Sequence, residues 1–208
     1  NMTAINLNES SVRELNEKLQ SGSSGDQFSV NNTVGKHALS VGLTSEINVE
    51  INGHVGYYCA GMNQQANIVI NGNAGPGLAE NMMSGTVVID GNAGSTFVAA
   101  IRGGDLVCKG SVGARTGIDQ KGGTILVGGK TGAFSGFMMQ RGRMIICGDA
   151  GMNLGDSMYD GTIYVGGEVE ELGVDCVPGE MTELDVRYLT DKLALYGMKS
   201  PRGVEKMQ

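Results

Sequence analysis

A glycine recurs every nineteen residues through more than half of this 208-residue chain, and this interval constrains the fold more than any other feature. Seven glycines hold the register without an insertion: Gly53, Gly72, Gly91, Gly110, Gly129, Gly148 and Gly167. Six have a second glycine three residues later: Gly56, Gly75, Gly94, Gly113, Gly132 and Gly151. In the seventh copy Glu170 stands there instead. A fixed period of this length is typical of architectures in which each repeat stacks on its neighbours.

Two apolar columns precede the glycines. The residues four places before them are Val49, Ile68, Val87, Leu106, Ile125, Met144 and Ile163. The residues two places before them are Ile51, Ile70, Ile89, Cys108, Val127, Ile146 and Val165. The column between these two is mixed, since it holds Glu50 as well as Val69 and Tyr164. This alternation predicts a short strand in each copy that buries two side chains.

A second inward column follows each glycine and consists mainly of small apolar residues: Val55, Ala74, Ala93, Val112, Thr131, Ala150 and Val169. The chain is therefore expected to turn at the glycine pair, where glycine enters positive-φ conformations without a Cβ penalty. About three short strands then fill each coil. The sequence predicts an all-β fold, a single-stranded right-handed parallel β-helix of about seven nineteen-residue coils. A left-handed hexapeptide helix is disfavoured because nineteen is not a multiple of six.

The two ends of the chain lack the repeat. Ser11 and Glu14 form a capping box that predicts a first helix, and residues 21–25 are expected to form a linker. Thr182 is expected to cap a second helix that ends near Tyr196. Both helices are expected to cap the open ends of the stack. The predicted divisions are 1–27 for the N-terminal helix and linker, 28–178 for the β-helix with regular coils over about 46–178, and 179–208 for the C-terminal helix and tail.

Composition narrows the functional classes. The net charge of −7 and the lack of a basic stripe argue against nucleic acid or an anionic membrane as a partner. No run approaches a membrane span, and the N-terminus lacks the apolar core of a signal peptide. Four cysteines without a CxxC pair fit a reduced, cytoplasmic protein.

Candidate chemistry is sparse. His54 is a formal candidate base for acyl transfer, although its place in a polar column favours a solvated surface residue. A sugar-acting group is conceivable from four residues: Arg102, Arg115, Asp119 and Lys121. The glycine-rich run at 72–77 lacks the following helix that a phosphate-binding loop requires, so its glycines are interpreted as turns. No catalytic, cofactor-binding or metal-binding residue is therefore expected on this chain.

Some segments are more specific than the coil pattern. They are residues 53–63, which contain two tyrosines and a methionine, 79–85, 147–151 and 154–157. These segments resemble the β-helical C-terminal domain of the glutamate synthase large chain. They are also similar to the stand-alone glutamate synthase-like subunit, and some complexes of that type act as N-methylglutamate synthase. A related module occurs as a β-helical subunit of formylmethanofuran dehydrogenase. The resemblance covers about residues 36–177.

The resemblance implies a non-catalytic scaffold that holds a class II amidotransferase-like subunit and an FMN-binding glutamate synthase-like subunit. FMN and an iron–sulfur cluster are then expected on those partners, with no cofactor here. Core filling is the default interpretation for Tyr57, Tyr58, Met62, Met82 and Met83, and the functional alternative is a contact surface for a larger partner. Two alternatives stay open: a formylmethanofuran dehydrogenase-type subunit, and a carbohydrate-active or acyl-transferring β-helix enzyme. Self-association also stays open.

Overall fold

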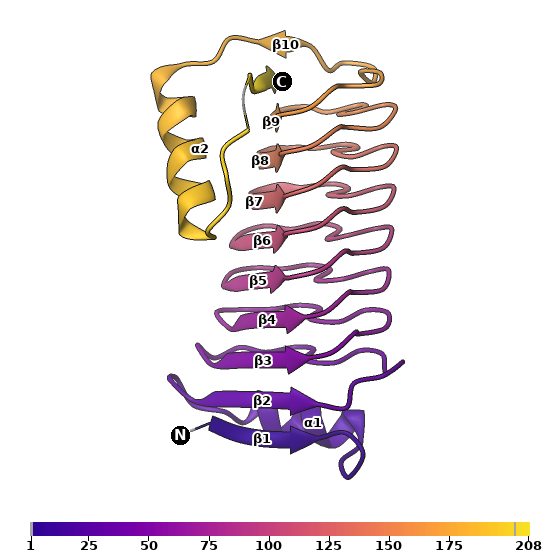
Figure 1. Ribbon diagram of the computed structural model, residues 1–208, viewed down its shortest axis with the longest axis vertical. Coiled ribbons are helices and arrows are strands. Elements are labelled where there is room, and N and C mark those ends of the chain that lie inside the picture. Colours follow the sequence, from indigo (N-terminus) through magenta and orange to yellow (C-terminus); the bar gives the residue numbers. More distant parts are fainter. Residues whose placement is uncertain (1, 202) are drawn as a thin grey trace.

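The protein is a rod of stacked coils (Figure 1). The computed structural model describes residues 2–201 and 203–208. One eleven-stranded sheet runs along the rod in the order β1-β2-β3-β4-β5-β6-β7-β8-β9-β11-β10. The repeat supplies seven parallel strands: β3 (Asn48–Asn52), β4 (Asn67–Asn71), β5 (Thr86–Ile89), β6 (Asp105–Cys108), β7 (Lys121–Val127), β8 (Arg141–Ile146) and β9 (Thr162–Val165). The predicted β-helix with a nineteen-residue coil is confirmed, and its right-handed winding stays a prediction.

The register explains the apolar columns. Ile51 pairs with Ile70, and Ile70 pairs with Ile89, so like residues lie above one another. All three are fully buried in one continuous core. Because the residues between them face outward, each coil contributes the same two side chains to the interior, as the alternation predicts.

The expectation of three strands per coil is wrong. Each coil has one strand, and the second inward column forms only single bridges such as Val55 to Ala74. The rest of the coil is a turn in which alternate residues have left-handed backbone, as at Tyr58, Ala60 and Met62. The amides of Tyr58 and Met62 donate to the next coil and that of Ala60 donates to the coil before. This alternation bonds the turn to both neighbours without a regular strand.

The corner glycines lie where the sequence places them, but the predicted reason is wrong. Among the described residues, Gly53 is the only one of the seven repeating glycines and the six that follow them by three residues that has a positive φ. The others are required by the close approach of the preceding coil, either through its backbone or through its polar side chains. A Cβ at Gly72 would lie 2.5 Å from the Gly53 carbonyl oxygen, and one at Gly148 would lie 2.6 Å from that of Gly129. Glycine therefore allows the coils to stack at these corners.

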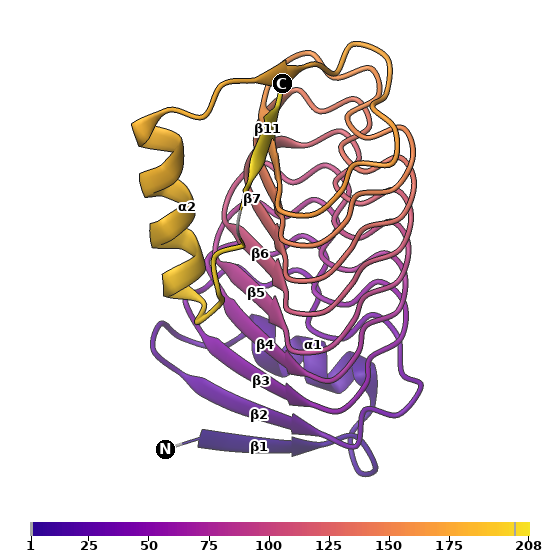
Figure 2. The same ribbon diagram turned by 45° about the horizontal axis from the view of Figure 1, so that its top comes forward.

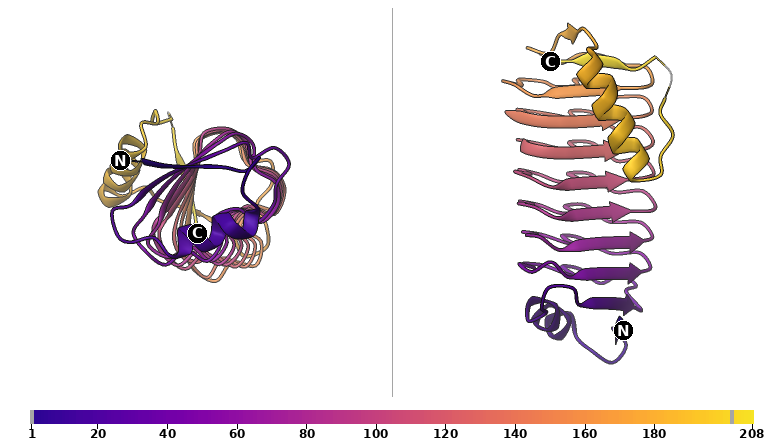
Figure 3. Two further views of the ribbon diagram at one scale, coloured as in Figure 1. Left: turned by 90° about the horizontal axis from the view of Figure 1, so that it is seen from below. Right: turned by 90° about the vertical axis from the view of Figure 1, so that its left-hand side faces the viewer.

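The N-terminal segment belongs to the rod. Strand β1 (Met2–Asn6) pairs in parallel with β2 (Gln27–Asn31), which pairs with β3, so residue 27 is not a physical boundary. Helix α1 (Val12–Gln20) has the predicted capping box. It lies across the lower end of the coil, where its leucines join the core (Figure 3). The cap function predicted for this helix is confirmed.

The C-terminal helix forms as predicted but lies elsewhere. Helix α2 (Glu183–Leu195) begins after Thr182 and runs along the outer face of strands β6–β9 (Figures 1 and 2). The last coil is instead followed by β11 (Glu205–Met207), antiparallel to β9, and then by β10 (Pro178–Gly179). In the described chain neither helix is long and apolar enough to cross a membrane.

Candidate functional site

A ladder of polar side chains runs along the glycine corner. The Nδ1 atom of His54 accepts a hydrogen bond from the Asn73 amide at 2.9 Å, and the Asn73 side chain accepts one from the Asn92 amide at 2.8 Å. The Asn92 side chain continues the pattern to the next coil. A Cβ at Gly91 would lie 2.1 Å from the Asn73 Oδ1 atom, so the ladder itself requires glycine. His54 therefore stabilises the stacking of two coils, in line with its interpretation as a surface residue.

The tyrosine-rich turn is exposed, and a histidine organises it. His37 Nδ1 accepts a hydrogen bond from the Tyr57 amide at 2.8 Å, and the two rings stack with centroids 4.6 Å apart. The Tyr58 ring meets the Tyr57 ring edge to face. The exposed fractions of Tyr57, Tyr58 and Met62 are 51%, 58% and 52%. Three of the predicted contact residues therefore present large apolar side chains to solvent.

Met82 does not belong to the exposed surface, whereas Met83 is accessible. Met82 is fully buried and Met83 is 44% exposed. Successive residues of the turn point to opposite sides. In the same way, Met138 is exposed and Met139 is buried. For Met82 the default interpretation as core filling is confirmed. We call the exposed set Tyr57, Tyr58, Met62 and Met83 the aromatic–methionine surface.

Burial keeps the four cysteine thiols in their neutral form. Burial raises the pKa of Cys59 to about 12, and it raises the pKa values of Cys108, Cys147 and Cys176 to about 11. The thiolate is the form that attacks, so none of these thiols is an activated nucleophile. Among residues 2–201 and 203–208 no three His, Cys, Asp or Glu side chains gather as a metal site.

The proposed sugar-acting group is only partly assembled. Asp119 lies 3.5 Å from the Lys121 ammonium and accepts a hydrogen bond from Gln140. Arg102 and Arg115 are exposed side chains of neighbouring coils. A glycosidase site generally needs two carboxyl groups across the scissile bond, and this group contains one.

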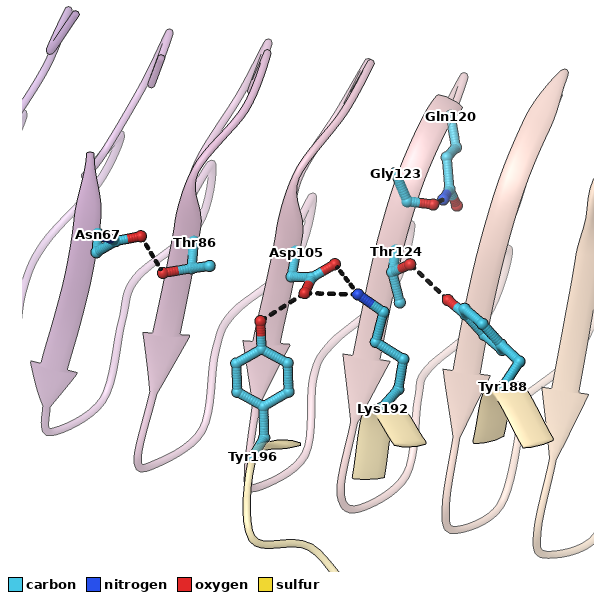
Figure 4. Close-up of polar contacts among 9 residues, drawn as sticks. All are labelled: Asn67, Thr86, Asp105, Gln120, Gly123, Thr124, Tyr188, Lys192 and Tyr196. Atoms are coloured by element: carbon cyan, nitrogen blue, oxygen red, sulfur yellow. Dashed lines mark hydrogen bonds and ion pairs between the residues drawn. The ribbon is translucent and has the colours of Figure 1, made fainter. Parts of the chain in front are cut away.

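Sequence reasoning missed the polar contacts that fix α2 to the sheet (Figure 4). Asp105 on β6 accepts hydrogen bonds from Lys192 at 2.8 Å and from the Tyr196 hydroxyl at 2.6 Å. One strand further, Thr124 shares a short hydrogen bond with Tyr188. These contacts join residues more than sixty positions apart, which no local motif reports.

A second cluster holds the upper end of α2. Asp185 accepts a hydrogen bond from the Tyr164 hydroxyl and lies 2.9 Å from the Lys206 ammonium. Burial alone would raise the pKa of Asp185, but the hydrogen bonds from Tyr164, Lys206 and Thr182 outweigh it and hold the pKa well below its usual value. The carboxylate is therefore charged in the folded protein.

One sequence signal could have located α2. In the outer column of the strands, Val107, Leu126, Ile145 and Tyr164 follow one another, where an earlier coil has Glu50. All four are buried, and α2 packs on them through Leu189 and Leu193. A run of apolar residues on a face that should meet solvent indicates a covering element.

Comparison with known proteins gives one partial relative. No protein-family model matches the sequence. Protein GlxC of Rhizobium meliloti (strain 1021) is 44% identical over 63 residues. The chain is a distant, partial homologue of GlxC. The aligned segment covers 29% of this chain and 28% of GlxC, so it relates a part of each protein.

Proposed function

We propose that this chain is a non-catalytic scaffold subunit of a glutamate synthase-type complex. It holds an amidotransferase-like subunit and an FMN-binding synthase-like subunit at a fixed separation. The observation that carries this proposal is the segment 53–63, whose residues resemble the glutamate synthase-like β-helix subunit and whose tyrosines are exposed. The partial homology to GlxC supports the same assignment.

The rod has the mechanical properties of a spacer. Nine parallel strands, β1 to β9, follow one another in the sheet, and steps of about 4.8 Å between them give a length of about 38 Å. Each interior coil is bonded to both neighbours through its strand and its turn. A solenoid of this kind resists bending because every coil is held on two sides. Partners bound to its sides therefore keep a constant distance.

The redox chemistry belongs to the partners in this proposal. The FMN and the iron–sulfur cluster that the resemblance implies lie on the other subunits. The histidines of this chain accept backbone hydrogen bonds of the stack, and its cysteines have raised pKa values. In this proposal these histidines and cysteines contribute to the fold.

Purification of the native complex through a tag on this chain tests the proposal. We expect an amidotransferase-like and an FMN-binding synthase-like protein to co-purify in fixed ratio. The isolated chain should neither hydrolyse glutamine nor release FMN on denaturation. Turnover by the isolated chain would overturn the proposal, and co-purification with molybdopterin-binding subunits would replace it with the formylmethanofuran dehydrogenase alternative.

A matched pair of variants tests the aromatic–methionine surface. Tyr58 and Met62 both have left-handed backbone, which asparagine tolerates well. The double variant Y58N/M62N should keep the fold and lose at least about tenfold in affinity for a partner subunit. The control is Leu184→Asn on the exposed side of α2, 71% exposed, which should bind as the wild type does.

A further inference from the structure

One corner of the rod gathers positive charge on a chain whose net charge is −7. Lys121 and Arg141 are direct register partners on β7 and β8, and Arg143 follows two residues later. Arg102 stands one repeat before Lys121, on the preceding coil. We call these four residues the basic corner. The three arginines are exposed and Lys121 is half-buried.

A break in the repeat creates this arrangement. In the nineteen-residue register Lys121 would face Gln140, but a register shift between Lys121 and Thr124 pairs it with Arg141. Bulges of this kind re-aim side chains and occur often beside functional sites. Like charges directly opposite each other on neighbouring strands destabilise a sheet. The fold therefore bears a cost here that an anionic partner would relieve.

The local acids do not balance the basic corner. The Asp119 carboxylate lies 3.5 Å from the Lys121 ammonium. One carboxylate oxygen of Asp160 accepts a hydrogen bond from the Gly161 amide. The Arg143 guanidinium lies over the Tyr188 ring at 4.1 Å, a cation–π contact. In the described chain the only salt bridge of the basic corner joins Lys121 to Asp119, so its three arginines make no ion pair.

Apolar side chains and a hollow accompany the charge. A surface hollow of about 640 Å³ is lined by Lys121, Met138, Gln140, Arg141 and Tyr159. Tyr159 is 81% exposed, and Met138 offers a flexible apolar contact beside the cations. A second hollow of about 400 Å³ also includes Arg141 and extends towards Arg143. Cations beside adaptable apolar groups fit a protein segment that carries carboxylates and at least one apolar side chain.

We propose that the basic corner docks an acidic segment of a partner protein. This inference rests on the proposed function and names one contact surface of the scaffold. A protein segment is favoured over a polyanion because Tyr159 and Met138 stand beside the cations and fit an apolar side chain next to the carboxylates. The cations then contribute specificity and rate of encounter, and the tyrosine and methionine contribute the apolar contact.

Charge reversal in the complex tests the inference. The variant R102E/R141E changes two exposed cations of the basic corner and leaves Arg143 on its tyrosine. The control K109E/K199E makes the same change in net charge at two exposed lysines outside it. Binding of each purified variant to the co-purified partner subunits is measured by biolayer interferometry at several salt concentrations. We expect R102E/R141E to bind at least about tenfold more weakly, with a shallower salt dependence, and the control to bind as the wild type does.

The outcomes separate this inference from the proposed function. Equal binding by R102E/R141E and the control would overturn the docking role of the basic corner and leave the proposed scaffold function intact. A wild-type chain that binds no partner subunit would overturn both. A phosphatidylserine vesicle or a 20-nucleotide RNA that binds the wild type more tightly than the partner subunits, and loses that binding in R102E/R141E, would overturn the assignment to a protein segment.

Discussion

The two halves of the sheet have the same interior and opposite exteriors. On strands β6–β9 the outer column carries Leu126 and Ile145 under helix α2, whereas on β3 and β4 the same column carries Glu50 and Val69. The inner columns are apolar and buried in both halves. The inner apolar residues therefore determine the coil. The residues that point outward from the strands determine whether that part of the sheet is exposed to solvent or covered by a helix.

Asparagines hold the open half together. The Asn71 side chain donates a hydrogen bond to Asn52 at 2.9 Å. Asn67 accepts one from the Thr86 hydroxyl at 2.8 Å (Figure 4). These ladders satisfy their own polar groups and leave the face hydrated. On the covered half, Asp105 occupies the column of Asn67 and bonds instead to α2. An aspartate in place of the asparagine thus replaces hydrogen bonds between neighbouring coils with hydrogen bonds to a helix that is distant in the sequence.

The largest predicted effect tests what the two halves share. Gly72→Ala and Gly148→Ala each place a Cβ within 2.6 Å of a backbone oxygen of the preceding coil, which cannot move aside. Each should lower the free energy of unfolding by about 3 kcal/mol or more. The control is Gly61→Ala, whose Cβ would meet its nearest neighbour at 3.9 Å. Urea unfolding followed by circular dichroism measures the differences, and tolerance of alanine at Gly72 would contradict the stacking role.

The second prediction compares the same substitution at covered and exposed positions of the outer column. Leu126→Asn buries an amide under α2 and should cost about 2–3 kcal/mol. Val69→Asn, at the matching position of the open half, should cost less than about 0.5 kcal/mol because that site is exposed. Equal losses in urea unfolding would show that the open half is covered in solution.

The third prediction concerns pH and is local to α2. The pKa of Asp185 is lowered in the folded state, so its contribution to stability is complete above the unfolded pKa near 3.9 and is lost as pH falls below it. The near-ultraviolet circular dichroism of the tyrosines around α2 should fade in that range, while the far-ultraviolet signal of the coils persists. Asp185→Asn should weaken α2 docking at pH 7 and remove this acid transition. A wild-type signal unchanged down to pH 2 would refute the assignment.

The smallest effect tests the corner ladder of the open half. His54→Ala removes the acceptor of the Asn73 amide and should cost about 1 kcal/mol. His54→Asn supplies the acceptor that the following coils use, and it should restore most of the loss. If both variants lose the same stability, the ring and not its acceptor atom stabilises this corner.

The parts of the fold that depend on local or repeated residues were predictable. The glycine interval gives the coil, the apolar columns give the core, and Ser11 and Thr182 begin the two helices as expected. The place of α2 was not predictable from local signals because it depends on contacts such as Lys192 with Asp105. The division between Met82 and Met83 depends on the alternating backbone of the turn, which the glycine pattern does not encode.

Reconstitution of glutamine-dependent synthase activity tests the scaffold role most directly. The amidotransferase-like and FMN-binding subunits are purified with and without this chain, and glutamine consumption and product formation are both measured. We predict that the coupled reaction requires this chain, that glutamine consumption matches product formation only when it is present, and that the chain alone is inactive. Full coupled turnover by the other two subunits without this chain would contradict its role as the scaffold.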